Sequence, residues 1–325
     1  RTYNIQSMFT RCVSNSVQFT RGLPYKQTTS LLAASCAAGV YLNQRRNFSS
    51  SFNVYAEEAV AQKKVYQGTP PEVDDTHRYI LNGNSLKGIE LKDLDITLYQ
   101  YQVCPFCCKV RAFLDYNKIP YKIVEVNPVL KGELKFSKDY KKVPIIIING
   151  VQLNDSSIII SSLSEIVSNK TTAERPKDEV EWRKWVDHKL VHTLPPNIYR
   201  SPKEAMDAFD YISTMNQFNW YQRAVAKYAG SMAMYGVSKK LKKKYGIEDE
   251  REAIYTCANE WMENLNGKPF HGGEKPDLAD LATYGALSSI EGLLTFNEML
   301  ANSNIGEWYW RVKREVGPCS GSKVN

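Results

Sequence analysis

The chain has 325 residues, of which 43% are hydrophobic and 24% are charged, and its formal net charge is +7. This length and balance are those of a folded protein with two domains and an extension rather than of a disordered chain. Seven cysteines with only one C-x-x-C pair favour a reducing compartment over a disulfide framework. No DNA- or RNA-binding motif accompanies the moderate positive charge, so we expect no nucleic-acid partner.

Residues 1–56 contain no Asp or Glu, while Arg and Lys recur among Ser, Thr, Asn and Gln. This composition is typical of a mitochondrial transit segment. The apolar run at 31–42 is shorter than the ~20 residues that span a bilayer, so we expect a tilted or partial anchor that contacts lipid or a mitochondrial membrane protein assembly. The predicted location is a mitochondrial membrane, with the Golgi or another endomembrane as the alternative.

The C-x-x-C pair, Cys104 and Cys107, follows an apolar run at 95–101 that is typical of a strand and precedes a segment at 109–114 that is typical of a helix. A thiol in the first turn of a helix lies among unpaired N–H groups at the positive end of the helix dipole, which stabilise the thiolate. We therefore predict Cys104 as a nucleophile. Cys107, three positions on, can exchange a proton or form a disulfide with it.

A zinc site and a purely structural cysteine pair are two other interpretations of this motif. Zinc requires about four ligands, and the sequence has neither a second C-x-x-C pair nor a finger spacing among its four histidines. We therefore predict no metal site. His188 and His192 lie one helical turn apart, but without a third ligand they are expected to be partly exposed helix residues. Cys108 is expected to be a small core residue.

The segments that follow complete the element order of a thioredoxin fold. They predict a strand at 120–127, a polar helical stretch at 133–138 and two strands within 142–153 that are joined by an Asn-Gly turn. Asp155 or Ser156 is expected to cap the next helix. In this fold the proline that opens a strand, here Pro144, is usually cis and faces the cysteine pair.

Helical periodicity dominates the second half of the chain, with helices predicted at 180–190, 224–241 and 252–265. Asp277 stands at a cap position with Asp280 three residues on, just before an apolar run, so both carboxylates can pair with N–H groups of one turn. An ordinary helix cap is one interpretation. A buried helix opened by such a cap is also similar to the folding motif of glutathione transferases.

Several strings of this sequence match one known family. They are 98–101, 104–107, 109–115, 124–128, 142–145 and 153–157 in the first half, and His192, 196–200, 209–212, 224–228 and 275–285 in the second. Together they span about residues 94–316 and resemble the membrane-associated prostaglandin E synthase type 2 family. The resemblance implies a thioredoxin- or glutaredoxin-like domain followed by a helical domain similar to that of glutathione transferases.

The resemblance also implies a glutathione-dependent thiol isomerase that converts a prostaglandin endoperoxide to a keto-alcohol, with Cys104 as the essential thiol. Glutathione would pair with the backbone of Val143, next to Pro144, in the manner of an added strand. Its glutamyl end would be held by Asp155 and Ser156 at a helix N-terminus.

Tyr101 and Phe106 match residues that line the substrate pocket of this family. By resemblance, Tyr101 directs its hydroxyl to a small apolar substrate or to haem, a second implied cofactor, and Phe106 shields the thiol. A strand-end aromatic that packs at the domain interface is the other interpretation of Tyr101. Animal members carry a long insertion between the domains, on which the haem pocket and homodimer contacts depend, whereas this chain has a short linker.

We therefore predict an α/β thioredoxin-like domain followed by an all-α domain of the glutathione transferase type. The boundaries are 1–56 for the basic targeting or anchor segment, 57–93 for a connector, 94–168 for the thioredoxin-like domain, 169–178 for a linker, 179–317 for the helical domain and 318–325 for a tail. Two alternatives to the isomerase stay open. One is a glutaredoxin-like dithiol oxidoreductase or glutathione transferase, and the other is an accessory subunit of a mitochondrial membrane complex.

Overall fold

The computed structural model describes residues 94–168, 174–215 and 218–324. The chain divides into two units, Arg1–Asp75 and Thr76–Asn325, and all the described residues belong to the second. The predicted targeting segment, the connector and residues 169–173 of the linker lie outside the described residues. Within the described ranges, no helix is long and apolar enough to cross a membrane.

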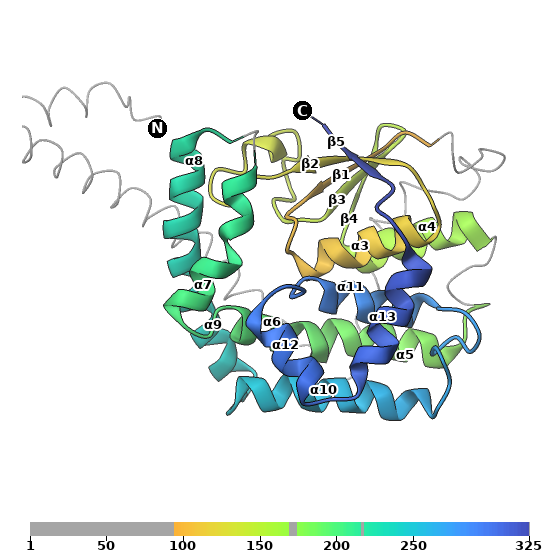
Figure 1. Ribbon diagram of the computed structural model, residues 1–325. Coiled ribbons are helices and arrows are strands. Elements are labelled where there is room, and N and C mark those ends of the chain that lie inside the picture. The colour runs from red at the N-terminus through yellow and green to blue at the C-terminus, as the bar shows by residue number, and fades with distance from the viewer. Residues whose placement is uncertain (1–93, 169–173, 216–217, 325) are drawn as a thin grey trace, which may run out of the picture. The chain divides into compact units, whose positions relative to one another are not determined.

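A five-stranded sheet forms the first part of the described chain (Figure 1). Its strands are β1 (Ile96–Gln100), β2 (Tyr121–Glu125), β3 (Ile145–Ile148), β4 (Val151–Asn154) and β5 (Gly321–Lys323), in the order β4-β3-β1-β2-β5. β1 and β2 are parallel, whereas β3 is antiparallel to both β1 and β4. The predicted hairpin is confirmed, since Asn149 and Gly150 have φ values of 49° and 82°, as a two-residue turn of this kind requires.

Two helices lie between this sheet and the helical part of the molecule (Figure 1). They are α3 (Pro105–Tyr116) and α4 (Ser156–Ser168), which contact each other, and α3 also packs against α11 (Leu278–Ser288). Since α3 begins directly after Cys104, the thiol motif lies where the sheet part and the helical part meet.

The rest of the described chain is mostly helical. Its other elements are α5 (Lys177–Trp185), the π turn η5 (Val186–Leu190), α6 (Val191–Ile198), α7 (Pro202–Ala208), the 3-10 helix η6 (Asp210–Thr214), α8 (Trp220–Val225), the π turn η7 (Ala226–Gly230), α9 (Ser231–Lys244), α10 (Glu250–Leu265), α12 (Leu294–Ala301) and α13 (Ile305–Val316). The three predicted helical segments are confirmed as helical. Two of them contain a π turn, a wider turn that frequently occurs at functional sites.

The central helix α11 is buried from Leu278 to Leu287. Asp277 accepts hydrogen bonds from the N–H groups of residues 279 and 280, and Asp280 accepts one from the N–H of Asp277, so the predicted paired cap is confirmed. Gly285 lets α11 approach α3 closely, because a Cβ at this position would lie 2.5 Å from the Cα of Lys109. The structure therefore has a thioredoxin-like part followed by an all-α part, and the predicted fold class is confirmed.

The polar stretch predicted as helical at 133–138 forms only a three-residue 3-10 helix, η3 (Gly132–Leu134). The Asn127 side chain closes a turn just before it by accepting two backbone N–H groups, and Lys131 has a left-handed φ of 48°. These local bonds compete with a regular helix, so the prediction was wrong in extent.

The last residues of the chain, predicted as a tail, include β5, which pairs in parallel with β2. Asp115 on α3 fixes this strand by accepting the N–H of Ser320 at 2.8 Å. Gly321 is needed for the close pairing, because a Cβ there would lie 2.6 Å from the side chains of Ile123 and Tyr121.

Candidate active site

Cys104 is the N-cap residue of α3, with extended backbone (φ −78°, ψ 123°), and its side chain is half-buried. The turn before the helix is closed by a bond from the Cys104 N–H to the carbonyl of Tyr101, 3.0 Å. No side chain caps α3, and its first turn holds no acidic residue. The free N–H groups of this turn therefore surround the Cys104 sulfur.

The two thiols of the motif differ in their protonation. The hydrogen bond from the Cys107 side chain is the largest cause that lowers the pKa of Cys104, and the N–H groups of Cys107 and Phe106 and the charge of Arg111 add to it against the effect of burial. Burial, followed by the bond to Cys104, raises the pKa of Cys107 well above its ordinary value. Cys104 is thus the more acidic thiol of the pair, and Cys107 is the one that keeps its proton more readily.

Arg111, two turns after Cys104, is a site residue that the sequence did not single out. Its guanidinium donates to the Cys108 sulfur at 3.1 Å, to the Gln102 carbonyl at 2.8 Å and to the Gln100 side chain at 2.7 Å. Cys108 is buried, as predicted for a small core residue. A basic residue on the helix face of the thiols was the sequence signal that could have identified Arg111.

Glu125 holds the loop between β1 and the thiol motif. One carboxylate oxygen accepts the N–H of Gln102 at 2.5 Å, and the other accepts the Gln100 side-chain amide at 3.1 Å. Burial raises the pKa of this carboxyl. The loop is therefore held by the same side chains that contact Arg111.

Tyr101 and Phe106 flank the motif in different environments. Tyr101 is half-buried and packs, together with Cys104, against a small apolar cluster. That cluster consists of Cys107, Val126, Leu134, Val143 and Ile145. Phe106 is 37% exposed, and the Lys109 ammonium lies 5.5 Å from the centre of its ring.

Val143 and Pro144 lie beside the thiols. Ile145 pairs with Tyr99 across the sheet, which brings the two preceding residues to the end of β1 where the motif begins. Val143 belongs to the same apolar cluster as Cys107. The Val143–Pro144 peptide bond is cis, as predicted for this fold.

Asp155 and Ser156 stand at the start of α4. The exposed Asp155 has a left-handed φ of 69°, and its carboxylate accepts the N–H groups of Ser157 at 2.8 Å and Ile158 at 3.2 Å, so its predicted capping role is confirmed. Ser156 is buried. Tyr140 packs against the apolar cluster that contains Cys107, and its phenol interacts with the backbone of Asp155, which links the start of α4 to that cluster.

Two phenols of the helical part have raised pKa values to which the charge of Cys104 contributes. Burial raises the pKa of Tyr199, at the end of α6, and the charge of Cys104 acts in the same direction. Burial likewise raises the pKa of Tyr211 in η6, with smaller effects from Glu125, Tyr199, Tyr101 and Cys104. No local sequence pattern indicated these two residues, because they lie far from Cys104 in the sequence.

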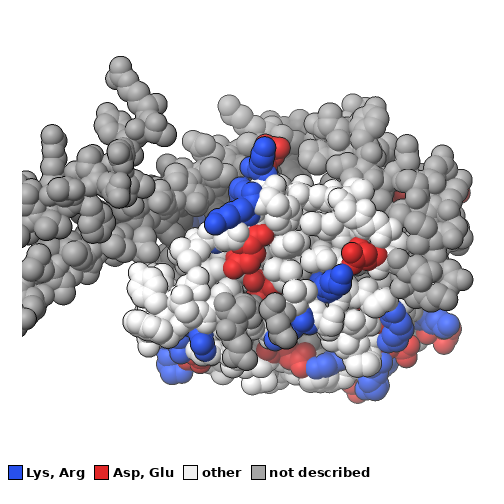
Figure 2. All heavy atoms as spheres, turned by 90° about the horizontal axis from the view of Figure 1, so that it is seen from above, with Lys and Arg blue, Asp and Glu red and all other residues white. Residues whose placement is uncertain are grey.

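Basic and histidine side chains of α6 and α9 make contacts within the helical part. Lys239 donates to the Arg200 carbonyl, Lys242 pairs with Glu250, and His192 stacks on Tyr245 at 4.1 Å between ring centres. The face seen in Figure 2 mixes acidic and basic side chains with uncharged surface. Among the described residues, no group of three or more His, Cys, Asp or Glu side chains could hold a metal ion.

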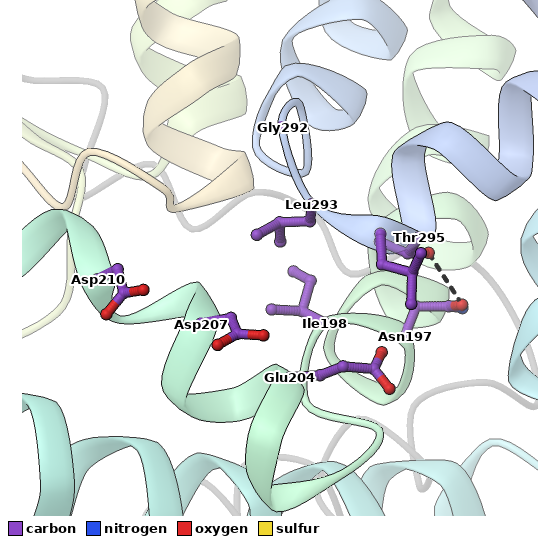
Figure 3. Close-up of a pocket in the computed structure, with 9 residues that line it drawn as sticks. Asn197, Ile198, Glu204, Asp207, Asp210, Gly292, Leu293 and Thr295 are labelled. Carbon is purple, nitrogen blue, oxygen red and sulfur yellow. Dashed lines mark hydrogen bonds between the residues drawn. The ribbon is translucent and has the colours of Figure 1, made fainter.

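A separate pocket of about 250 Å³ lies between α6, the start of α7, η6 and the loop before α12. Figure 3 shows Glu204, Asp207 and Asp210 on one side and Leu293 on the other. Each carboxylate already has a cation: Glu204 pairs with Arg200 and Arg251, Asp207 with Lys203, and Asp210 with Lys227. None of the predicted site residues lines this pocket.

The fold and the thiol site define a thioredoxin-fold protein of the glutathione transferase type. The model of the family "Glutathione S-transferase, N-terminal domain" matches residues 98–171. A solved Tau class glutathione S-transferase from mango, Mangifera indica, is 19% identical, covers 70% of this chain and 94% of that chain, and gives a TM-score of 0.42.

Two curated relatives are more similar in sequence. Prostaglandin E synthase 2 of Danio rerio is 41% identical in an alignment of 269 positions that covers 68% of this chain and 71% of the relative. Prostaglandin E synthase 2 of Mus musculus is 40% identical in an alignment of 272 positions that covers 69% of this chain and 71% of the relative. The chain belongs to the prostaglandin E synthase 2 family.

Proposed function

We propose that this protein is a glutathione-dependent thiol isomerase that converts a prostaglandin-type endoperoxide to a keto-alcohol, with Cys104 as the essential thiol. The difference between the two thiols carries this proposal. Cys104 has a lowered pKa at an uncapped helix N-terminus, whereas Cys107 is buried and has a raised pKa. One thiolate beside one neutral thiol suits a nucleophile with a neighbouring proton donor.

The proposed reaction begins when the Cys104 thiolate bonds to one peroxide oxygen and the O–O bond breaks. The second oxygen takes a proton from a neighbouring acid and becomes the alcohol, and the candidates for that acid are the buried phenols of Tyr199 and Tyr211, whose raised pKa values are due in part to the charge of Cys104. Loss of a proton from the carbon that carries the sulfur-bound oxygen forms the carbonyl and breaks the S–O bond. Sulfur is oxidised in the first step and reduced in the last, so the isomerisation needs no net oxidant.

Glutathione is the proposed cosubstrate, and the residues predicted to hold it fit that role. Val143 lies in the apolar cluster that contains Cys107. Asp155 and both cysteines lie within electrostatic range of the Tyr140 phenol. The backbone of Val143 would pair with the tripeptide, and Asp155 and Ser156 would hold its glutamyl end. Glutathione bound there supplies a second thiol beside Cys104. Haem, which the resemblance also implies, is not needed for this reaction and stays a prediction.

Turnover of an endoperoxide substrate with glutathione tests the proposal, with product formation followed by mass spectrometry. Cys104→Ser should lose at least about 100-fold in rate, since a hydroxyl is a far weaker nucleophile. Cys107→Ser should keep its rate within roughly threefold, because serine can still donate to the Cys104 sulfur. Equal rates in Cys104→Ser and the unchanged protein would refute Cys104 as the essential thiol.

A dithiol oxidoreductase is the second candidate function, and the hydrogen bond between the Cys104 and Cys107 side chains favours it. This chemistry forms a disulfide between the two sulfurs, so Cys107→Ser should then abolish turnover of a disulfide substrate. Full endoperoxide turnover by Cys107→Ser, with no disulfide reduction by the unchanged protein, would remove this candidate.

We expect residues 1–56 to bring the protein to a mitochondrial membrane, as their acid-free composition suggests. Fractionation of cells that express the chain with and without these residues tests the location. Native gels of the solubilised membranes distinguish a free enzyme or a homodimer from an accessory subunit. Migration only within a much larger assembly, together with no turnover, would favour the accessory subunit.

A further inference from the structure

A buried ion pair links the thiol helix to the helical part. Lys109, in the second turn of α3, has a side chain that is only 1% exposed, and its ammonium pairs with one carboxylate oxygen of Asp187. Asp187 belongs to the π turn η5 of the helical part. A buried ammonium needs such a partner, because an unpaired charge away from water is strongly destabilising.

The second oxygen of the same carboxylate reaches a different helix. It accepts the hydroxyl of Ser157 at 2.5 Å, and Ser157 lies in the first turn of α4, two residues after Asp155. Asp187 therefore joins two helices through Lys109 and Ser157. Lys109 belongs to α3, whose start holds Cys104. Ser157 belongs to the start of α4, which is proposed to hold the glutamyl end of glutathione.

The surroundings keep Asp187 ionised. Burial alone would raise its pKa, but Lys109, Ser157 and Arg183 together outweigh burial and lower it. Arg183, one turn before Asp187, donates to the Ser157 carbonyl at 3.3 Å and to the Ser161 hydroxyl, one turn further along α4, at 2.9 Å. Asp187 is thus the link to the Ser157 side chain, whereas Arg183 contacts the Ser157 backbone and the next turn of α4.

We propose that Asp187 is a positioning residue for the proposed glutathione site. It holds the N-termini of α3 and α4 at a fixed position relative to each other. The thiolate and the glutamyl end of glutathione are then kept at the separation that one bound molecule spans. This inference rests on the proposed function. It assigns to the helical part a role in binding glutathione through α4, without contact between Asp187 and the ligand.

The variant Ser157→Ala tests this link while leaving the Lys109–Asp187 pair intact. Glutathione affinity, measured by calorimetry, should fall by about tenfold, because the hydrogen bond from α4 to the charged Asp187 is lost, while the Arg183 bond to the backbone of residue 157 stays. The pKa of Cys104, measured from the pH dependence of its alkylation, should stay unchanged. With saturating glutathione, kcat should also stay unchanged while KM for glutathione rises, a split that general loss of fold does not produce.

The matched control is Ser161→Ala, which removes the Arg183 bond to the same helix one turn further from the site. It should change glutathione affinity by less than about twofold. An equal loss in Ser161→Ala and Ser157→Ala would mean that any loosening of α4 weakens binding, and would overturn the role assigned to Asp187. Unchanged affinity in Ser157→Ala would overturn it as well.

A double variant, Lys109→Met with Asp187→Leu, avoids the unpaired buried charge that removal of only one partner would leave. Replacing a buried ion pair by apolar residues of similar size often preserves stability. This variant should melt as a folded protein and bind glutathione at least about tenfold more weakly. Binding equal to that of the unchanged protein would refute the inference. If the unchanged protein itself bound no glutathione, the proposed function would fail first, and that result is distinct from a failure of Asp187 alone.

Discussion

The N-termini of α3 and α11 differ in whether side chains accept their unpaired backbone N–H groups. Each helix begins with backbone N–H groups that have no partner inside the helix. At α11, Asp277 and Asp280 accept those groups within one turn, and Asp280 also accepts the indole N–H of Trp308 at 2.9 Å. At α3, Cys104 makes no capping bond, Pro105 carries no N–H, and the first turn has no acidic residue.

The contrast shows how one feature of a helix serves stability in one region and chemistry in the other. Saturated N–H groups fix α11 at the centre of the helical part, where it also meets α3. Unsaturated N–H groups at α3 stay available to a sulfur anion and lower its pKa. The capped helix α11 thus supports the thiol helix α3, because the two helices pack directly against each other.

The largest expected effect follows from removing the saturated cap. Asp280 is fully buried and accepts four donors, the N–H groups of His271, Gly272 and Asp277 and the Trp308 indole. Asp280→Ala should lower the free energy of unfolding by about 3–5 kcal/mol, because the buried Trp308 indole and three partly buried backbone N–H groups all lose their acceptor. Denaturation in urea, followed by tryptophan fluorescence, measures this loss.

Ser201→Ala is the control for an ordinary cap. Ser201 caps α7 by accepting the N–H of Glu204 at 3.2 Å, and its loss should cost about 1 kcal/mol. If Asp280→Ala cost no more than Ser201→Ala, the comparison would be wrong, and the cap of α11 would be no more important than any other in the molecule.

A smaller effect is expected when the open N-terminus of α3 is given a carboxylate. Phe106 is exposed at the second position of this helix, so Phe106→Glu places a negative charge beside the thiolate without filling the core. The charge competes for the N–H groups and repels the sulfur anion, so the pKa of Cys104 should rise. Alkylation of Cys104 at pH 7 should slow by roughly three- to tenfold.

Phe106→Gln separates the effect of the charge from the loss of the ring. It removes the aromatic side chain and adds no charge, so its alkylation rate should stay close to that of the unchanged protein. Similar slowing in both variants would show that the ring of Phe106, rather than the uncapped helix end, sets the reactivity of Cys104.

Local patterns in the sequence predicted what local forces decide. The Asn-Gly turn, the cap by Asp155 and the paired cap of Asp277 and Asp280 each depend on residues a few positions apart, and the structure has all of them. The cis bond before Pro144 was expected from the element order of the fold. The turn and the two caps could be predicted because the residues that form them are close in sequence.

Long-range contacts could not be predicted in this way. Asp187 is 78 residues from Lys109, and Tyr199 and Tyr211, whose pKa values are raised in part by Cys104, belong to the helical part of the chain. The strand β5 was missed since it is short and polar, and is fixed by a contact from Ser320 to Asp115, 205 residues away. Each of these depends on where whole helices lie, which no short pattern specifies.

The smallest expected effect concerns the pH dependence of the α11 cap. Burial alone would lower the pKa of His271, but the Asp277 carboxylate, 2.5 Å from the imidazole Nδ1, outweighs burial with help from Asp178 and Asp280 and raises the pKa. The folded state therefore binds this proton more tightly than the unfolded chain, whose histidine pKa is about 6.5. The resulting stabilisation is fully present below that pH and is lost as the pH rises through the folded pKa. Because burial of the ring offsets much of the gain from the carboxylates, the loss should be below about 1 kcal/mol between pH 6.5 and 9, and His271→Gln should remove it. Urea denaturation of both proteins across this range gives the difference, and parallel pH profiles would mean that the pair of His271 and Asp277 adds no stability to the cap.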